Sequence, residues 1–236
     1  MSDADSLSDI DPREDEEPVE PAAYEAPAGR FITFEGGEGT GKSTQAGILA
    51  NRLARAGRKV FATREPGGSP AAEEIREALL SGRVWPYGPF AEALMFSVAR
   101  ADHIETSIGQ ALLDGKWVVC DRFIDSTRAY QGATAGVPRG LINALERLTT
   151  NGLLPDITFI LDIPPEQGLA RAAERRSGTT PDRFESQELM LHERVRRAFL
   201  DIAEEEPDRC VVIDASQPEA MVAEDVWEVV LQRLSP

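Results

Sequence analysis

Eight consecutive residues, from Gly36 to Ser43, have the order of a phosphate-binding loop. They fit the pattern G-x-x-x-x-G-K-[ST]. Glycines let successive backbone N–H groups turn inward around an anion, and a helix that starts near Lys42 adds the positive end of its dipole. We expect Lys42 to reach the β- and γ-phosphates of a nucleoside triphosphate and the Ser43 hydroxyl to ligate Mg²⁺. The residues predicted to bind this nucleotide are Gly36, Gly37, Glu38, Gly39, Thr40, Gly41, Lys42, Ser43 and Thr44. The motif alone does not separate a kinase from a GTPase or a motor.

A second group of polar residues follows the apolar run Val118 to Cys120. Asp121 can hold Mg²⁺ through water, and the fork of Arg122 suits a second phosphate group. An ordinary ion pair at the end of a strand remains the alternative. Thr127 and Tyr130 are three residues apart and would share one face of a helical turn. They could offer a hydroxyl to a base and an aromatic wall to a sugar, or simply begin a polar helix.

Two further segments carry cations beside groups that suit a nucleotide. Arg64 begins the sequence Arg-Glu-Pro-Gly-Gly-Ser, in which a stiff proline turn and two glycines follow a predicted strand. A plain turn is the alternative. Phe96 and Arg100 are spaced i, i+4 and would share a helix face, where a phenyl ring could stack on a pyrimidine and a guanidinium could donate to its carbonyl. A core phenylalanine with a snorkelling arginine is the competing interpretation.

A cluster of arginines surrounds the small polar segment 177–181. Helix, polar loop and second helix in that order are typical of a hinged flap, although a solvated basic turn would have the same composition. The arginines of this cluster are Arg171, Arg175, Arg176 and Arg183.

Short apolar strands must alternate with helices to position these groups. This alternation predicts a three-layer α/β/α fold with a parallel five-stranded sheet covered on both faces. Such sheets bind ligands at the carboxyl ends of their strands, where the groups above are expected. The predicted strands are 31–34, 59–63, 117–120, 157–161 and 210–213. The predicted helices are 44–56, 71–80, 91–113, 141–149, 166–176, 187–205 and 218–234.

Length, charge and cysteine content limit the class of protein. The 236 residues carry a net charge of −16, which argues against nucleic acid as a partner. Residues 1–29 are predicted to be a disordered acidic tail, and 30–236 a single domain. No apolar run reaches the ~20 residues of a membrane helix, and the acidic start does not resemble a signal peptide. Two cysteines are too few for a disulfide scaffold, so a cytoplasmic location is expected.

Six motifs in order resemble the bacterial thymidylate kinases, which are P-loop nucleoside monophosphate kinases. They are EGGEGTGKST, TREPGGS, LMFSVARADH, DRFIDSTRAYQG, LDIPPEQGLAR and DRFE, and the resemblance runs from about Arg30 to Leu234. It implies a P-loop core with a helical lid at about 171–185. It also implies transfer of the γ-phosphoryl group of ATP to dTMP, a step in dTTP synthesis, by a homodimer that uses Mg²⁺.

The resemblance also implies a role for each matching residue. Lys42, Ser43 and the loop amides would hold ATP and Mg²⁺, and Glu38 would contact the 3′-hydroxyl of the acceptor nucleotide. Arg64 and Arg122 would hold the acceptor phosphate. Phe96 would stack on thymine with Arg100 and Thr127 at its edge, and Tyr130 would crowd the 2′ position. Either Arg175 or Arg176 would be the lid arginine, since the lid loop is slightly long for the family. Ser69 stands where the family often has threonine.

Two other functions remain open from the sequence. A kinase for dUMP, dCMP or AMP would have the same phosphate loop, but the residues Phe96, Arg100 and Thr127 favour a thymine-like base. A P-loop switch without a small-molecule acceptor would leave Arg64 and Arg122 without a use. The guanine motif Asn-Lys-x-Asp is missing from the sequence, which weakens the case for a GTPase.

Overall fold

The computed structural model describes residues 29–176 and 188–236. Its sheet has five parallel strands, as the alternation of apolar runs predicts. Their order is β2-β3-β1-β4-β5. The strands are β1 (Arg30–Glu35), β2 (Val60–Arg64), β3 (Trp117–Asp121), β4 (Ile157–Asp162) and β5 (Cys210–Asp214). The predicted tail 1–29 lies outside the described residues except for Gly29, and so does most of the predicted lid.

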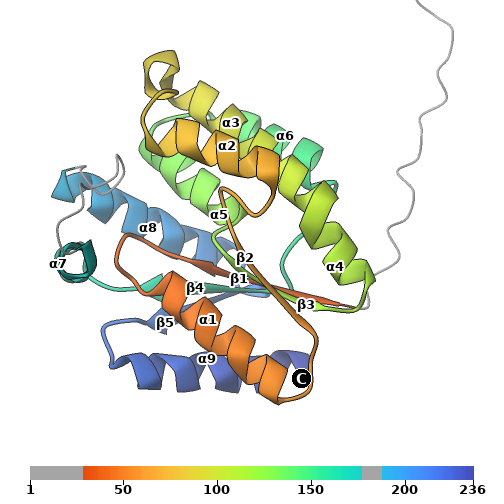
Figure 1. The fold of residues 1–236 in the computed structure, drawn as a ribbon. Helices are drawn as coiled ribbons and strands as arrows, with labels where there is room; N and C mark the ends of the chain where they lie inside the picture. Colours follow the sequence, from red (N-terminus) through yellow and green to blue (C-terminus); the bar gives the residue numbers. More distant parts are fainter. Residues whose placement is uncertain (1–28, 177–187) are drawn as a thin grey trace, which may run out of the picture.

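Helices cover both faces of the sheet (Figure 1). One face is covered by α1 (Lys42–Arg55) and α9 (Glu219–Leu234). The opposite side carries α2 (Pro70–Leu80), α3 (Gly88–His103), α4 (Gly109–Leu113), α5 (Ile124–Thr127), α6 (Arg139–Thr150) and α8 (Leu189–Glu205). The remaining helix, α7 (Pro165–Arg176), lies beyond the carboxyl end of β4.

Alternate residues of the strands build a separate core on each face. Phe34 and Phe159 are fully buried against Leu53 of α1, with their rings 5.2 Å apart. On the other face, Phe31 packs edge-on against Phe123 at 4.9 Å. Burial on both faces makes the strands nearly continuous apolar runs, which is why they are visible in the sequence.

The structure corrects one predicted helix. The range 91–113 was expected as a single helix, but the chain forms α3, a π-helical segment Ile104–Ile108 and then α4. A second π-helical segment, Arg128–Thr134, follows α5. Apolar spacing reports which side of a helix is buried, and it does not show where one turn is widened. No helix in residues 29–176 and 188–236 is long and apolar enough to cross a membrane.

Candidate active site

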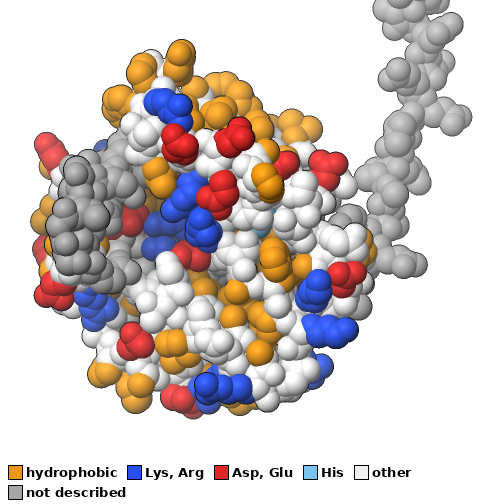
Figure 2. Space-filling model, in the orientation of Figure 1, with side chains coloured by type: hydrophobic (Ala, Val, Ile, Leu, Met, Phe, Trp, Pro, Cys, Tyr) orange, Lys and Arg blue, Asp and Glu red, His pale blue; other side chains and the backbone are white. Residues whose placement is uncertain are grey.

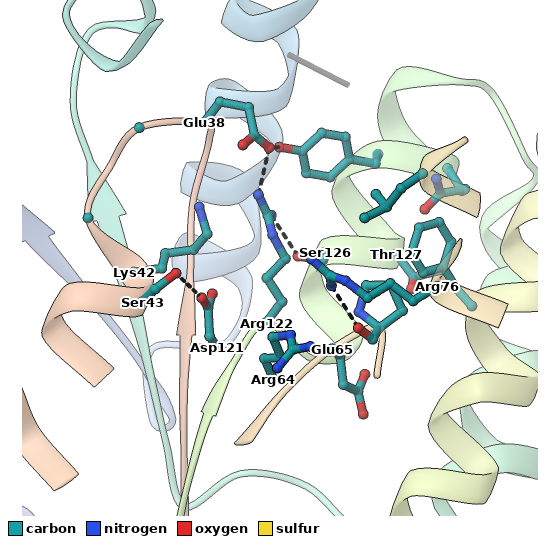
Figure 3. Close-up of a pocket in the computed structure, with 17 residues that line it drawn as sticks. Glu38, Lys42, Ser43, Arg64, Glu65, Arg76, Asp121, Arg122, Ser126 and Thr127 are labelled. Carbon is teal, nitrogen blue, oxygen red and sulfur yellow. Dashed lines mark hydrogen bonds and ion pairs between the residues drawn. The ribbon is translucent and has the colours of Figure 1, made fainter. Parts of the chain in front are cut away.

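The register of the sheet brings three loops to one edge. Phe34 of β1 pairs with Asp121 of β3, and Asp121 pairs in turn with Arg64 of β2. The loops that follow these strands therefore begin side by side and line one crevice (Figure 3). In the surface view, Lys and Arg side chains gather in a hollow beside carboxylates (Figure 2). The sequence predicted this meeting of strand ends, and the register confirms it.

The phosphate-binding loop needs its glycines for two reasons. Gly36, Gly39 and Gly41 have φ angles of 137°, 70° and 95°, a region that side chains rarely allow. A Cβ atom on Gly39 would also lie 1.7 Å from the carbonyl oxygen of Gly168 in α7. The loop thus turns tightly, touches α7 directly and leads into α1 at Lys42. Helix α1 begins at Lys42, where the phosphate-loop motif predicts a helix start, and two residues before the range 44–56 that apolar spacing predicts.

Lys42 is buried and folds back onto its own loop. Its Nζ atom donates to the Gly37 carbonyl at 2.6 Å and to Thr40 Oγ1 at 3.3 Å. Burial, together with the nearby positive charge of Arg122, lowers the pKa of Lys42 to about 8. A bound phosphate would offer this ammonium a stronger acceptor than a neutral carbonyl.

Ser43 and Asp121 form the part of the site that fits a metal ion. The Ser43 hydroxyl donates to Asp121 Oδ2. The other oxygen, Oδ1, is buried and has no hydrogen-bond partner in the described part of the chain. A hydroxyl beside a buried carboxylate oxygen suits Mg²⁺, a hard cation that keeps several waters and is shared with substrate phosphates. No cluster of three or more metal-ligating side chains occurs among the described residues, so these two residues do not form a complete metal cage.

Arg122 joins the phosphate loop to the opposite wall of the crevice. It has a φ of 72°, and its side chain extends toward Glu38 (Figure 3). Nη2 donates to Glu38 Oε1 at 2.6 Å, Nη1 donates to Ser126 Oγ at 3.1 Å, and the guanidinium lies 5.3 Å from the centre of the Tyr130 ring. Burial alone would raise the pKa of Glu38, but Arg122 and Lys42 outweigh it and lower this pKa to about 2. Glu38 is therefore a carboxylate at neutral pH.

The sequence analysis missed Glu35, the last residue of β1. Its carboxylate is fully buried and accepts hydrogen bonds from the backbone N–H of Phe123 at 2.7 Å and from Ser126 Oγ at 2.6 Å. Burial and the negative charge of Asp125 raise the pKa of Glu35 to about 7. The side chain holds the loop that carries Arg122. The sequence did contain a signal for this role, since Glu35 is an acidic residue directly after the apolar run 31–34.

The second wall of the crevice is the loop after β2, from Arg64 to Ser69. Arg64 is exposed, and its Nη2 donates to Glu73 at 2.9 Å. Pro66 follows a cis peptide bond, and its carbonyl accepts from Arg76 Nη1 at 2.7 Å. Glu65, Arg76, Ser126 and Gln131 also line the crevice, and of these four Arg76 lies outside the motifs quoted from the sequence.

The predicted base-binding residues occupy two different depths. Phe96, Thr127 and Tyr130 line the crevice, together with Arg64 and Arg122. Arg100 lies behind them at 3 % exposure, where its Nε donates to Glu65 at 2.8 Å and its Nη2 to Thr127 Oγ1 at 3.2 Å. The snorkelling alternative for Arg100 is therefore wrong. Spacing in the sequence gives the face of a helix, but it does not give the depth of a side chain.

Other predicted residues lie at the edge of the site. Gly36, Gly37 and Thr40 border a smaller hollow on the side of the loop that faces α7 and α8. Thr44 lies in the first turn of α1 and is not among the residues that line the crevice. Arg171 donates to the carbonyls of Ala215 at 2.7 Å and Ser216 at 3.3 Å, so it is anchored to the body of the protein.

The arginines predicted for the lid lie at the end of helix α7 or after it in the sequence. Arg175 and Arg176 end helix α7, but their side chains are outside the described residues, as are Arg183 and the segment 177–187.

Comparison with known proteins gives a consistent set of relatives. The family model described as thymidylate kinase matches residues 34–226. The curated thymidylate kinase of Bradyrhizobium diazoefficiens is 56 % identical over 208 residues, which are 88 % of this chain and 91 % of the relative. That of Rhodopseudomonas palustris (strain ATCC BAA-98 / CGA009) is 56 % identical over 207 residues, 87 % of this chain and 90 % of the relative. The crystal structure of thymidylate kinase from Ehrlichia chaffeensis superposes with a TM-score of 0.69 at 35 % identity, covering 86 % of this chain and 99 % of that chain.

Proposed function

The chain belongs to the thymidylate kinase family, and on that premise we propose how its crevice holds the two substrates. The reaction transfers the γ-phosphoryl group of ATP to dTMP and gives dTDP and ADP. An oxygen of the dTMP phosphate forms a bond to the γ-phosphorus while the bond to the β–γ bridging oxygen breaks. ADP leaves with that electron pair. Because such transition states are loose, positioning and neutralisation of charge supply most of the catalysis.

ATP binds on the side of the phosphate loop. The backbone N–H groups between Gly36 and Ser43 surround the β-phosphate, and Lys42 exchanges its carbonyl partner for the β- and γ-phosphates. Ser43 would hold Mg²⁺ directly and Asp121 would hold it through water, in keeping with the unpartnered Oδ1 atom. That ion, when bound, neutralises charge on the phosphates and fixes their orientation.

The acceptor dTMP lies on the opposite side, against the loop after β2. Arg122 and Arg64 hold its phosphate, with Arg122 placed between the two substrates. Phe96 stacks on the thymine ring, and Thr127 meets its polar edge. Arg100 donates to Thr127 from behind the crevice and reaches the same edge through Nη1, which bonds no residue in the described part of the chain. The observation that supports this assignment most directly is the position of Arg122, which donates to Glu38 of the phosphate loop and lies over the ring of Tyr130 in the segment Arg128–Thr134.

Glu38 and Tyr130 together recognise the sugar. Tyr130 donates to Glu38 Oε1 at 2.9 Å, and this bond places the phenol ring against the crevice. The carboxylate can accept from a 3′-hydroxyl, while the ring fills the space that a 2′-hydroxyl would need. The pair therefore favours a deoxyribose with a free 3′-hydroxyl.

An acceptor that lacks the 3′-hydroxyl tests this arrangement. The wild-type protein should prefer dTMP over 3′-deoxythymidine monophosphate in kcat/KM by at least about tenfold, the value of one hydrogen bond to a charged group. Glu38→Gln also weakens the hold on Arg122, so both acceptors should react more slowly. The ratio between them isolates the hydroxyl contact and should fall toward one. An unchanged ratio in Glu38→Gln would place the 3′-hydroxyl elsewhere.

The exposed apolar side chains of α3 and α6 support a homodimer. Phe90, Leu94 and Val98 of α3 are 46 %, 42 % and 46 % exposed and lie four residues apart, so they form one stripe. Leu148 of α6 is 81 % exposed. In the surface view apolar side chains gather at this upper edge of the molecule (Figure 2). A contiguous apolar surface of this kind is typical of a protein–protein interface.

We also assign the protein to the cytoplasm. Cys120 and Cys210 are both free and buried, as is common for proteins of a reducing compartment.

A further inference from the structure

His103 is fully buried at the end of α3 and is held on both of its ring nitrogens. Nδ1 lies 3.2 Å from Glu65 Oε1, and Nε2 lies 2.8 Å from Thr63 Oγ1. The backbone approaches closely as well, because a Cβ atom on Gly68 would lie 2.2 Å from Nε2. The imidazole therefore has one fixed orientation, in contact with both ends of the loop that forms the acceptor wall.

Glu65 connects His103 to the residues that we propose bind the base. Its Oε1 atom faces His103, while its Oε2 atom accepts from Arg100 Nε at 2.8 Å. Arg100 in turn donates through Nη2 to the Phe123 carbonyl at 3.0 Å and to Thr127 Oγ1 at 3.2 Å. The hydrogen bonds of Arg100 within the described part of the chain use Nε and Nη2, and Nη1 is the nitrogen left for a ligand. A continuous set of contacts thus connects His103 to the crevice.

Other contacts hold the same loop without His103. Ser69 Oγ donates to Asp102, Ser107 Oγ donates to the Gly68 carbonyl at 3.3 Å, and Arg76 donates to the Pro66 carbonyl. The fold of the loop therefore has several independent supports. What His103 alone supplies is a second partner for the carboxylate that orients Arg100.

We propose that His103 is a positioning residue for the acceptor nucleotide, acting through Glu65 on Arg100. Nδ1–H donates to Glu65, fixes the rotation of the carboxylate and so sets the plane of the guanidinium. The contacts of Arg100 reach Thr127 and the Phe123 carbonyl, and none of them reaches the phosphate loop directly, so the main effect falls on the base of dTMP. This inference rests on the proposed contact of Arg100 and Thr127 with thymine.

Two amide variants separate the two nitrogens of the ring. In His103→Asn the side-chain NH₂ can take the place of Nδ1–H and keep the bond to Glu65, while the bond to Thr63 is lost. In His103→Gln the amide reaches the place of Nε2, so Thr63 keeps its partner and Glu65 loses one. Both variants remove a similar part of the ring, which makes each a packing control for the other.

Steady-state kinetics gives the readout. We expect His103→Gln to raise KM for dTMP about tenfold, with KM for ATP within about twofold of wild type, because a misoriented charged donor weakens acceptor binding by that order. His103→Asn should remain close to wild type in both values. Equal effects of the two variants, or a rise in both KM values together, would show that His103 only packs the loop. That result would overturn the inference.

Further variants keep the test decisive. Thr63→Val should leave KM for dTMP unchanged, since the path does not pass through Thr63. If His103→Gln does not fold, Glu65→Gln provides the same test: its amide cannot accept from both partners, and an unchanged KM for dTMP would overturn the proposal. Arg100→Met separates the proposed contact of Arg100 with thymine from the proposed role of His103. If it leaves KM for dTMP unchanged, the proposed thymine contact is wrong. If it raises KM while His103→Gln does not, only the role of His103 is wrong.

Discussion

Glu35 and Glu38 lie in one short segment, and their neighbours shift their pKa values in opposite directions. Glu35 is buried next to Asp125 and has a pKa raised to about 7. For Glu38, three residues later, burial also favours the protonated form, but Arg122, Lys42 and Tyr130 outweigh it and lower its pKa to about 2. At the residue scale one carboxylate, that of Glu35, holds the loop that carries Arg122, and the other, that of Glu38, lines the crevice.

The lowered pKa of Lys42 makes ATP use sensitive to alkaline pH. Phosphates bind the ammonium form, and the free protein loses this proton as the pH rises through about 8. We expect kcat/KM for ATP to fall above that pH, approaching tenfold per pH unit, because this parameter reports the ionisation of the free enzyme. Lys42→Arg is the control, since its charge persists and its lower activity should not decline over the same range. A flat wild-type profile up to pH 9.5 would contradict the assignment of Lys42.

Phe96 decides whether the acceptor base is stacked. It is half-buried and lines the crevice, so Phe96→Ala should raise KM for dTMP by about tenfold, the size expected for one aromatic contact with its buried area. KM for ATP should remain unchanged. Phe96→Leu keeps the apolar volume without the ring and should recover less than half of the lost affinity in free-energy terms. If both substrates are affected equally, Phe96 is a core residue, as the competing interpretation of the sequence holds.

At the element scale, helix α7 is the link between the phosphate loop and the predicted lid. Gly168, near its start, touches the loop at Gly39, and Arg171 is tied to the body of the protein. The helix ends at Arg176. The loop itself holds a single cation, Lys42, and Glu38 adds a negative charge. Additional positive charge for the transition state must come from another segment, and α7 leads directly to the clustered arginines.

Either Arg175 or Arg176 is therefore expected to supply the missing charge. An arginine of this kind contributes ~10³–10⁵ in turnover. We expect the double variant Arg175→Ala/Arg176→Ala to lose at least about 10²-fold in kcat at saturating ATP and dTMP, with one single variant severe and the other mild. A double variant that keeps more than about a tenth of wild-type turnover would exclude the lid as the source.

Strands and the phosphate loop could be predicted from the sequence because their signals are local. Buried strands appear as apolar runs, and the glycine pattern before Lys42 encodes its own geometry. The contact between Arg100 and Glu65 could not be predicted, since it joins residues 35 positions apart in the chain. The π-helical segment Ile104–Ile108 was missed because one widened turn barely changes the apolar pattern.

At the scale of the whole molecule, the acceptor site and the proposed dimer surface share α3. Phe96, Arg100 and His103 belong to the helix whose Phe90, Leu94 and Val98 are exposed. We expect the wild-type protein to sediment as a dimer. Leu94→Glu should shift it toward the monomer, because a charge in an apolar interface must be desolvated. Gln110→Glu, a charge added on α4 outside this stripe, is the control. Monomeric wild-type protein at micromolar concentration would contradict the proposed dimer.

The direct measurement of the central claim is ADP release in the presence of ATP and one nucleoside monophosphate at a time. The crevice joins a phosphate loop to the site that we propose for dTMP, so release should depend on dTMP and yield dTDP in equal amount. Release with dUMP should be slower, and release with dCMP or AMP slower still. ADP release that is independent of any monophosphate, or faster with AMP than with dTMP, would contradict this account.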